Sequence, residues 1–166
     1  KIKDLDLQIE KTQKAPERGE VTLVKVNMGA PILKGADIPV AIDKEPVVDE
    51  PIVVDGKEYR MTCVSMGNPH AVVFVDDTKH FPIEQVGPLF ENHALFPKRT
   101  NTEFVQILSK EEINMRVWER GTGETLACGT GCGSITSVLR LTGRLAEDRL
   151  LLHNRGGDLT VTVSGD

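Results

Sequence analysis

Residues 127–143 read ACGTGCGSITSVLRLTG, and this stretch decides the fold. Its apolar positions follow one helical face, at the spacing i, i+3, i+4 and i+7: Ile135, Val138, Leu139 and Thr142. Gly143 then supplies a natural C-terminal stop. Because Gly and Ser fill the first turns, neighbouring strands can approach this helix closely. We therefore predict a short helix that is buried among β-strands.

Short strands joined by turns are expected on both sides of this helix. The clearest signal is a hairpin over residues 52–66, where Asp55 and Gly56 supply the positive φ angles of a tight primed turn. The apolar residues 71–75 suit a strand only if both of its faces are buried. Further strands are expected at residues 5–9, 21–27, 104–108, 113–119, 150–153 and 159–164, with a turn at 16–19.

Two other segments complete the predicted organisation. Residues 83–92 are expected to form a second helix, with Pro82 suited to its first turn. Residues 33–50 carry Pro39, Pro46 and scattered charges, and are expected to be a loop with little regular structure. The sequence therefore predicts one α+β domain, in which many strands surround one or two helices.

Composition excludes several classes of function. The chain has 166 residues, and its formal net charge of -5 argues against a general binder of nucleic acid or of an anionic membrane surface. No apolar run approaches the length that crosses a bilayer, so we predict no membrane span. Three cysteines without a secretory signal indicate reduced thiols and a cytoplasmic protein. The first residue is not Met, which suggests a processed or partial chain.

A cysteine stands where the central helix is expected to begin, within ACGTG at residues 127–131. The glycines leave backbone N–H groups bare, and with the helix dipole these groups form a site for an anion. The same field lowers the pKa of a cysteine, so we predict that Cys128 carries a usable thiolate near neutral pH. These residues alone leave a second interpretation equally open, in which the glycines admit a buried helix and Cys128 only packs.

The other two cysteines are expected to lie in the core. Cys63 falls in an apolar, strand-like run, and Cys132 lies one turn into the helix, toward its apolar face. Cys128 and Cys132 could both touch one metal ion, but the two further ligands of a zinc site are missing at normal spacing. We therefore predict no metal site.

Several polar residues suit an amino-acid ligand. Glu119 and Arg120 precede the glycine-rich loop, and an Arg fork can hold a carboxylate while a Glu takes an ammonium group. Asn68 and Asn101 are turn-type asparagines, and His70 leads into an apolar strand, where it could act as a base or an orienting group. Taken singly, each residue also has an ordinary explanation. Glu119 and Arg120 can be solvated surface charges, Asn68 and Asn101 can cap the backbone of turns, and His70 can have no catalytic role.

Taken together and in order, four segments resemble the diaminopimelate epimerase family: NMGAP (27–31), MGNPHA (66–71), RTNTEF (99–104) and VWERGTGETLACGTG (117–131). The last two are highly specific, and the resemblance runs from about residue 21 to the end. It implies a fold of two similar halves, each a strand-rich barrel around a central helix, with the substrate between them.

The resemblance also implies a chemistry. The family converts LL-diaminopimelate to meso-diaminopimelate in lysine biosynthesis, without cofactor or metal, using two cysteines on opposite faces of the substrate. By resemblance, Cys128 is the acid/base of this half, and Glu119 and His70 are catalytic residues close to the reacting centre. The substrate-binding residues implied are Asn68, Asn101, Glu119, Arg120, Gly129 and Thr130.

One departure from the family is serious. Its first-half motif, a Cys-Gly-Asn-Gly turn before a helix, is absent, and neither Cys63 nor Cys132 has that setting. We therefore expect residues 1–166 to be a single domain that corresponds to the C-terminal half of the enzyme. We expect this half to be inactive without its N-terminal half, and a homodimer is one assembly that the sequence leaves open. The alternatives are a related cofactor-independent racemase or isomerase, of the proline racemase or phenazine-biosynthesis type, and a non-catalytic thiol sensor using Cys128 and Cys132.

Overall fold

The structure is a computed structural model that describes residues 4–10, 23–145 and 147–164 of the chain. Over these residues it contains one ten-stranded sheet, two α-helices and a short 3-10 helix. The strands are β1 (Asp4–Glu10), β2 (Leu23–Gly29), β3 (Glu50–Val54), β4 (Lys57–Ser65), β5 (Pro69–Phe74), β6 (Asn101–Ile107), β7 (Glu112–Glu119), β8 (Gly123–Thr125), β9 (Arg149–Asn154) and β10 (Gly157–Ser164). The helices are η1 (Gly35–Asp37), α1 (Ile83–Glu91) and α2 (Gly129–Leu141).

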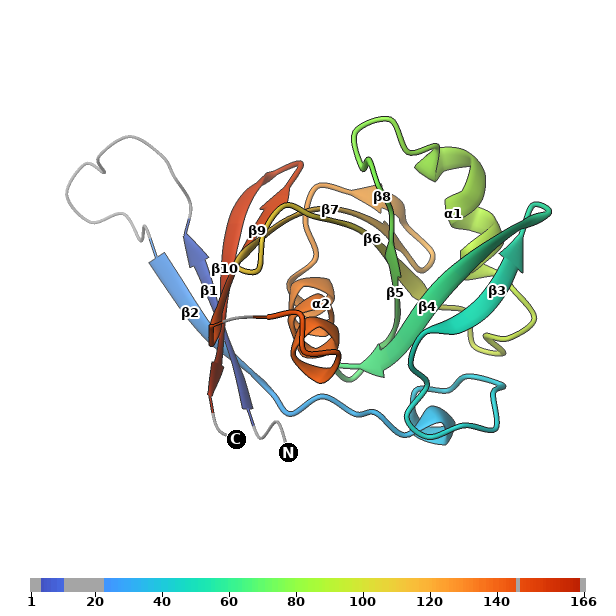
Figure 1. The fold of residues 1–166 in the computed structure, drawn as a ribbon, viewed down its shortest axis with the longest axis horizontal. Helices are drawn as coiled ribbons and strands as arrows, with labels where there is room; N and C mark the ends of the chain where they lie inside the picture. The colour runs from blue at the N-terminus through green and yellow to red at the C-terminus, as the bar shows by residue number, and fades with distance from the viewer. Residues whose placement is uncertain (1–3, 11–22, 146, 165–166) are drawn as a thin grey trace.

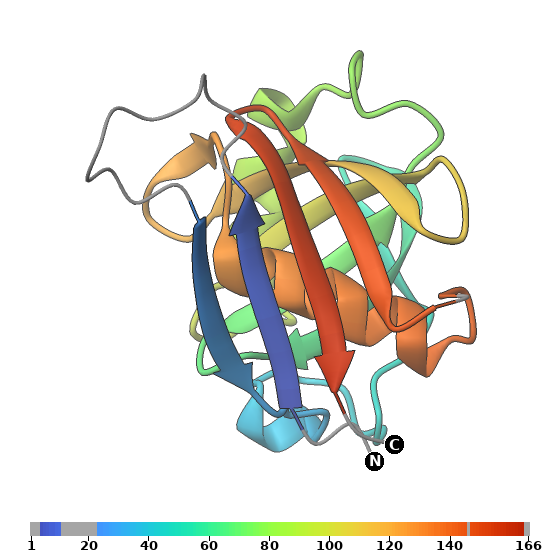
Figure 2. The same ribbon diagram turned by 90° about the vertical axis from the view of Figure 1, so that its left-hand side faces the viewer.

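The sheet curls around α2. Its strand order is β2-β1-β10-β9-β7-β6-β5-β4-β3, with β8 added alongside β7 (Figure 1). Neighbouring strands are antiparallel except β5 with β6 and β7 with β9. A bridge between Ile32 and Ser65 links the chain after β2 to the end of β4. Figure 2 shows β1, β2, β9 and β10 crossing one side of α2, so the expected strand-rich, barrel-like domain around a central helix is confirmed.

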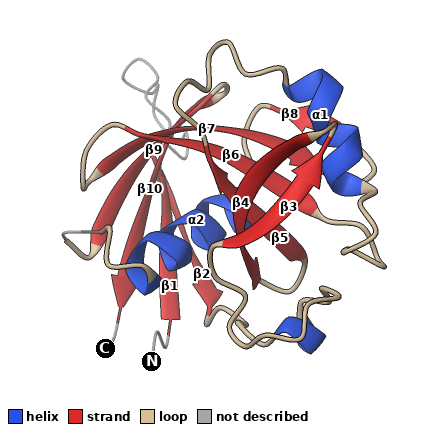
Figure 3. Ribbon diagram, turned by 45° about the vertical axis from the view of Figure 1, so that its right-hand side comes forward, coloured by secondary structure: helices blue, strands red, loops and turns tan. Residues whose placement is uncertain are grey.

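The middle strands are buried on both faces because a separate core lies on each side of the sheet. Successive side chains of a strand point to opposite sides, so each of these strands contributes to both cores. On the inner face, Val64, Val72 and Val105 pack against α2. On the outer face, Cys63 and Phe104 belong to a second core, which α1 and the 33–50 segment cover (Figure 3). The prediction that residues 71–75 form a strand buried on both faces is confirmed by β5.

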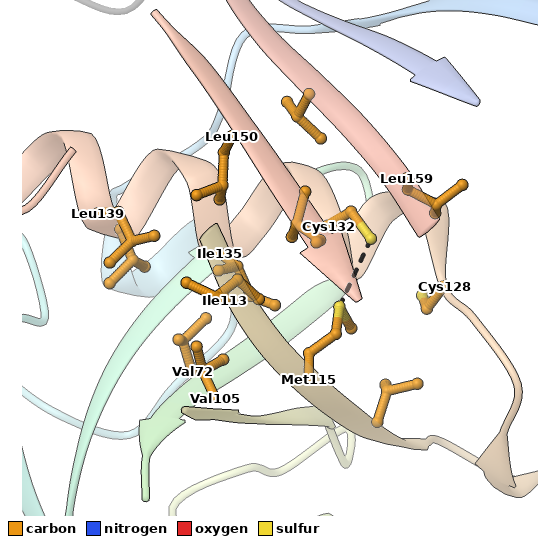
Figure 4. Packing of buried hydrophobic residues seen from close by; sticks show 14 of the residues in the cluster. Val72, Val105, Ile113, Met115, Cys128, Cys132, Ile135, Leu139, Leu150 and Leu159 are labelled. Atoms are coloured by element: carbon orange, nitrogen blue, oxygen red, sulfur yellow. Dashed lines mark hydrogen bonds between the residues drawn. The ribbon is translucent and has the colours of Figure 1, made fainter. Parts of the chain in front are cut away.

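The helix α2 is buried more completely than its sequence pattern suggested. Every residue from Gly131 to Leu139 is buried, not only the apolar face. The hydroxyls of Ser134, Thr136 and Ser137 turn back onto the helix: each donates to the carbonyl four residues earlier, as Ser137 Oγ does to Gly133 at 2.7 Å. Because these hydroxyls are satisfied internally, they can lie in an apolar environment, where Figure 4 shows Ile135 and Leu139 among strand residues.

Most predicted elements are present. The hairpin has its tight turn at Asp55 and Gly56, with φ of 52° and 73°, and Gly143 ends α2 with φ of 68°. The predicted second helix corresponds to α1. The segment 33–50 has little regular structure, as expected, and its single helical turn is η1. Strand β8 is not among the predicted strands, because its glycine-rich sequence is typical of a loop.

Two expectations lie partly outside the described residues. The turn at residues 16–19 falls in the part of the chain that the structure does not describe, and the strand at 21–27 is described from Leu23 onward as β2. None of the helices in the described part is long and apolar enough to cross a membrane.

A histidine joins three strands and makes stability depend on pH. His153 Nε2 lies 2.5 Å from Glu112 Oε1 and its Nδ1 lies 2.7 Å from Asp158 Oδ1. Hydrogen bonds to Glu112 and then Asp158 raise the pKa of His153 above its ordinary value of 6.5. Because the folded-state pKa is raised, this stabilisation is fully present below 6.5 and is lost as the pH rises through the folded value.

We therefore expect His153→Gln to lower the free energy of unfolding mainly in acidic buffer. The difference from the unsubstituted chain should be larger at about pH 6 than at about pH 9. Urea unfolding at a series of pH values measures it. A difference that stayed constant over this range would show that the imidazolium does not contribute.

Candidate active site

The N-terminus of α2 is the centre of the candidate site. Cys128 is the capping residue, with an extended backbone (φ −136°, ψ 112°), and its sulfur accepts a hydrogen bond from the Gly131 N–H at 3.3 Å. The N–H groups of Gly129 and Thr130 lie in the first turn, where no intrahelical acceptor exists. With the helix dipole, these donors favour an anionic group at this point.

The environment of Cys128 corrects one prediction. Its side chain is only 8% exposed, and burial raises the pKa of Cys128 to about 11, with a further contribution from the negative charge of Glu103. The hydrogen bonds from Thr130 and Gly131 act in the opposite direction but are outweighed. The expectation of a thiolate near neutral pH is therefore wrong for this chain by itself.

Cys128 nevertheless stands apart from the other two cysteines. Burial raises the pKa of Cys63 to about 12, and complete burial raises that of Cys132 as well. Both lie in the core, as predicted. Figure 4 shows Cys132 inside the cluster, with its sulfur 3.6 Å from that of Met115, and Cys128 at the margin of the cluster.

His70 joins Cys128 through a line of polar contacts. It lies on β5 with the same inward orientation as Val72, and it is fully buried. His70 Nδ1 is 2.6 Å from Glu103 Oε1, and His70 Nε2 is 3.1 Å from Thr130 Oγ1. Thr130 Oγ1 is in turn 3.4 Å from Cys128 Sγ. The structure therefore brings His70 and Thr130 together with the thiol.

Two asparagines lie beside these groups. The Asn68 side chain contacts His70 Nε2 through Oδ1 at 3.0 Å and donates through Nδ2 to Thr130 Oγ1 at 3.3 Å. Asn101, the first residue of β6, links the start of β5 to the residue after β7: its Nδ2 donates to the Pro69 carbonyl at 2.9 Å, and its Oδ1 accepts from the Arg120 backbone N–H at 2.8 Å. In this structure Asn101 therefore shapes the backbone around the site.

Glu119 and Arg120 lie where β7 ends and the glycine-rich loop begins. Glu119 Oε1 accepts from Thr125 Oγ1 at 2.5 Å, and its negative charge raises the pKa of Cys128 slightly. The Arg120 guanidinium donates through Nη1 to the Lys98 carbonyl at 3.0 Å and is partly exposed. Glu119 is the last residue of β7 and is close enough to Cys128 to act on its pKa, whereas the contact of the Arg120 guanidinium is with Lys98.

Sequence reasoning gave no role to two buried carboxylates, Glu103 and Glu91. The signal for Glu103 was available, since it is a charged residue between Thr102 and Phe104 in a strand buried on both sides. Glu91 gave no comparable signal, because an acidic residue at the end of an amphipathic helix is ordinarily solvated.

Glu91 fastens the loop that carries Glu119 and Arg120. Its two oxygens accept three hydrogen bonds of 2.8 Å each, from Arg99 Nη1, Trp118 Nε1 and the Gly121 N–H. Although burial opposes the charge, the hydrogen bonds from Trp118 and Gly121 hold the pKa of Glu91 below its usual value. The Gly121 backbone has φ of 77°, which this contact holds in place.

We expect Glu91→Gln to lower the free energy of unfolding by about 1–3 kcal/mol, because it weakens charge-assisted hydrogen bonds to buried donors. Since the folded-state pKa of Glu91 is lowered, the effect should be present at neutral pH and fade as the pH falls through that value. Urea unfolding with Glu84→Gln, an exposed change on the same helix, as control would test this. Equal losses for the two variants would contradict it.

Comparison of the sequence with known protein families identifies the family of this chain. The sequence model of the diaminopimelate epimerase family matches residues 62–166, which is more than half of the chain. The chain belongs to the diaminopimelate epimerase family. All the candidate site residues, from Asn68 to Thr130, lie within the matched region.

Curated relatives agree with this family. The diaminopimelate epimerase of Agathobacter rectalis is 54% identical over 153 residues, covering 87% of this chain and 53% of the relative. That of Methanococcus maripaludis is 55% identical (87% and 52% covered), and that of Moorella thermoacetica is 52% identical (89% and 53% covered). The chain therefore spans about half the length of the curated diaminopimelate epimerases it matches.

Among solved structures, a Bacillus anthracis phenazine biosynthesis protein of the PhzF family is similar with a TM-score of 0.45. It is 27% identical, and the match covers 61% of this chain and 32% of that protein.

Proposed function

We propose that this chain supplies one half of the active site of a diaminopimelate epimerase. The reaction would convert LL-diaminopimelate to meso-diaminopimelate by proton transfer between two cysteines, without a cofactor. The observation that carries the proposal is Cys128 at the N-terminus of α2, in contact with Thr130 and beside first-turn N–H groups that have no acceptor within the helix. Relatives that are 52–55% identical and named diaminopimelate epimerase support the same activity.

The chemistry explains why a thiol is placed at a helix N-terminus. The α-proton of an amino acid is a far weaker acid than a thiol, so its removal needs stabilisation of the negative charge that develops. In our proposal the N–H groups of Gly129 and Thr130 hold the α-carboxylate and supply that stabilisation without reorganising. Burial contributes as well, since a thiol whose pKa is about 11 forms a stronger base once it is deprotonated.

Inversion requires a second group on the opposite face of the α-carbon. In the proposal that group is a cysteine of an N-terminal half, which is not part of residues 1–166. Glu119, Arg120 and Asn68 would hold the remaining ammonium and carboxylate groups, and His70 would lie next to Cys128. The cytoplasmic location and the homodimeric assembly remain predictions.

A fusion tests the proposal. The N-terminal half of the Agathobacter rectalis relative is joined to this chain, and the two isomers of diaminopimelate are separated by chromatography over time. We expect interconversion of the LL and meso isomers and no reaction with proline. Activity on a smaller amino acid in place of diaminopimelate would favour a related racemase. Loss of free thiols on mild oxidation, with no isomerisation, would favour a thiol sensor.

A further inference from the structure

The hairpin of β9 and β10 turns next to the segment that leads into Cys128. Its two turn residues, Arg155 and Gly156, lie between the end of β9 and the start of β10. The Gly156 N–H donates to the Leu126 carbonyl at 2.8 Å. This hydrogen bond attaches the turn to the backbone two residues before the thiol.

The contact leaves no room for a side chain at position 156. A Cβ atom on Gly156 would lie 2.9 Å from Leu126 Cβ and 3.2 Å from the Leu126 carbonyl oxygen. Because Cβ and the carbonyl oxygen are bonded directly to the backbone, rotation of the Leu126 side chain cannot relieve the overlap. A glycine is therefore required for this close approach, and a larger residue must displace either the turn or the Leu126 backbone.

An ion pair attaches the turn to the same segment a second time. Arg155 Nη1 lies 2.7 Å from Glu124 Oε2, and Glu124 is the middle residue of β8. Glu124 is itself held in place, because Arg116 of β7 donates to its two oxygens at 2.7 and 3.0 Å. Hydrogen bonds from Arg116 above all keep the pKa of Glu124 below its usual value. The turn is thus paired with a strand that is anchored to β7.

The same hairpin also contacts α2 beyond the thiol. The side-chain amide of Asn154, the last residue of β9, lies 3.8 Å from Cys132 Sγ. Leu159 of β10 belongs to the same buried cluster as Cys128, and Figure 4 shows both. The hairpin therefore contacts the chain before Cys128, at Leu126, and after it, at Cys132.

The residues between β8 and Cys128 are not held by burial of their own side chains. Leu126 is 63% exposed, and Ala127 is exposed as well. Their backbone nevertheless sets where Cys128 enters α2 as the extended capping residue. The contacts of Arg155 and Gly156 supply the restraint that packing does not.

We propose that the turn between β9 and β10 positions the Cys128 thiol by holding the Leu126 backbone, with Gly156 as the residue that permits this contact. The proposal rests on the acid/base role of Cys128 proposed above. Gly156 is a positioning residue, because it acts through Leu126 and not on the substrate. Since a displacement of about 1 Å can lower the rate of a reaction by about 10²-fold, the restraint matters to catalysis.

The first measurement uses Gly156→Ala in the 166-residue chain. Alkylation of Cys128 and Cys63 by iodoacetamide is followed by mass spectrometry, and the ratio of the two rates is compared with that of the unsubstituted chain. Cys128 is only 8% exposed, so displacing Leu126 admits water to the thiol and lowers the pKa that burial raises. We expect the ratio to rise by at least about threefold. An unchanged or lower ratio would overturn the proposal.

Gly143→Ala is the matched control. It makes the same change at the far end of α2, where a φ of 68° strains an alanine but a Cβ atom meets nothing within 4 Å. This variant should lose stability without moving Leu126, so the ratio of alkylation rates should stay unchanged. A rise equal to that in Gly156→Ala would show that general destabilisation exposes the thiol, and would overturn the proposal.

A second variant keeps the test decisive if Gly156→Ala does not fold. The Arg155 side chain is 53% exposed, so Arg155→Met removes the ion pair with Glu124 and leaves the fold intact. We expect the ratio of Cys128 to Cys63 alkylation to rise by about twofold, because the Gly156 hydrogen bond remains. Arg155→Lys should restore the ratio, since an ammonium group can keep the ion pair. No change in Arg155→Met would count against the proposal.

The fusion separates this inference from the proposed function. In an active fusion, Gly156→Ala should lower kcat for diaminopimelate by roughly 10- to 100-fold. KM should stay within a few-fold, because Arg120 and Asn68 lie outside the displaced segment, and Gly143→Ala should change neither constant. An unchanged kcat in Gly156→Ala would overturn the inference and leave the epimerase function standing. An inactive unsubstituted fusion would remove the proposed function, and the alkylation ratio would still decide whether the turn places the thiol.

Discussion

Cys128→Ala in the fusion with the Agathobacter rectalis half is expected to slow exchange of the diaminopimelate α-proton by at least about 10³-fold. Removing a general acid or base costs about 10²–10⁴-fold, and inversion needs this group in each direction, as base one way and as acid the other. The substitution removes little volume and leaves α2 buried, so the fold should persist. Exchange is followed by loss of the α-proton signal in heavy water.

Cys63→Ala is the matched control for this prediction. Cys63 is fully buried in the outer core and contacts Met61 rather than the α2 N-terminus. We expect it to lower stability while exchange stays within a few-fold of the unsubstituted fusion. An active Cys128→Ala fusion, or equal losses for the two variants, would show that the thiol at α2 is not the acid/base.

Arg120→Met is expected to lower kcat/KM for diaminopimelate in the same fusion by roughly 30- to 1,000-fold. Only one end of diaminopimelate reacts, so the other end must be held by charge. Loss of a charge-assisted contact in a closed site costs about 2–4 kcal/mol. The guanidinium of Arg120 donates only to the Lys98 carbonyl among the described residues, which leaves further donors for a carboxylate.

The conservative change separates charge from geometry. Arg120→Lys should recover only part of the loss, because an ammonium group cannot reproduce the two-pronged contact of a guanidinium. Arg60→Met, on β4 and paired with Asp49, removes an equal charge away from the α2 N-terminus and should leave kcat/KM within a few-fold. Near-normal kcat/KM in Arg120→Met would eliminate the clamp and strengthen the case for a racemase of a smaller amino acid.

Local sequence patterns predicted most of the helices, strands and turns of this fold, because neighbouring residues in the chain determine each of them. The Asp55–Gly56 turn, the apolar run of β5 and the Gly143 stop depend on residues next to one another in the chain. Burial of α2 among strands was expected from its Gly and Ser residues. The barrel-like form of the sheet came from resemblance to a family, since no local pattern specifies that β7 pairs with β9 in parallel.

What the sequence could not supply depends on contacts between distant residues. The raised pKa of Cys128 follows from burial by strands and from the charge of Glu103, 25 positions earlier in the chain. The hydrogen bond from His70 to Glu103 likewise joins β5 to β6, 33 positions apart. Helix position alone suggested a low pKa, because the field of the N-terminus is a local property whereas desolvation is not.

The most direct test of the half-site proposal compares the 166-residue chain with the fusion. Each is incubated with LL-diaminopimelate in heavy water, and deuterium at the α-carbon and the appearance of the meso isomer are measured together. We predict rapid deuterium uptake and inversion by the fusion. We predict negligible uptake by the chain alone, because only one of its three thiols, Cys128, lies at the α2 N-terminus, whereas Cys63 and Cys132 lie in the core. Inversion by the chain alone at the rate of the fusion would contradict the proposal.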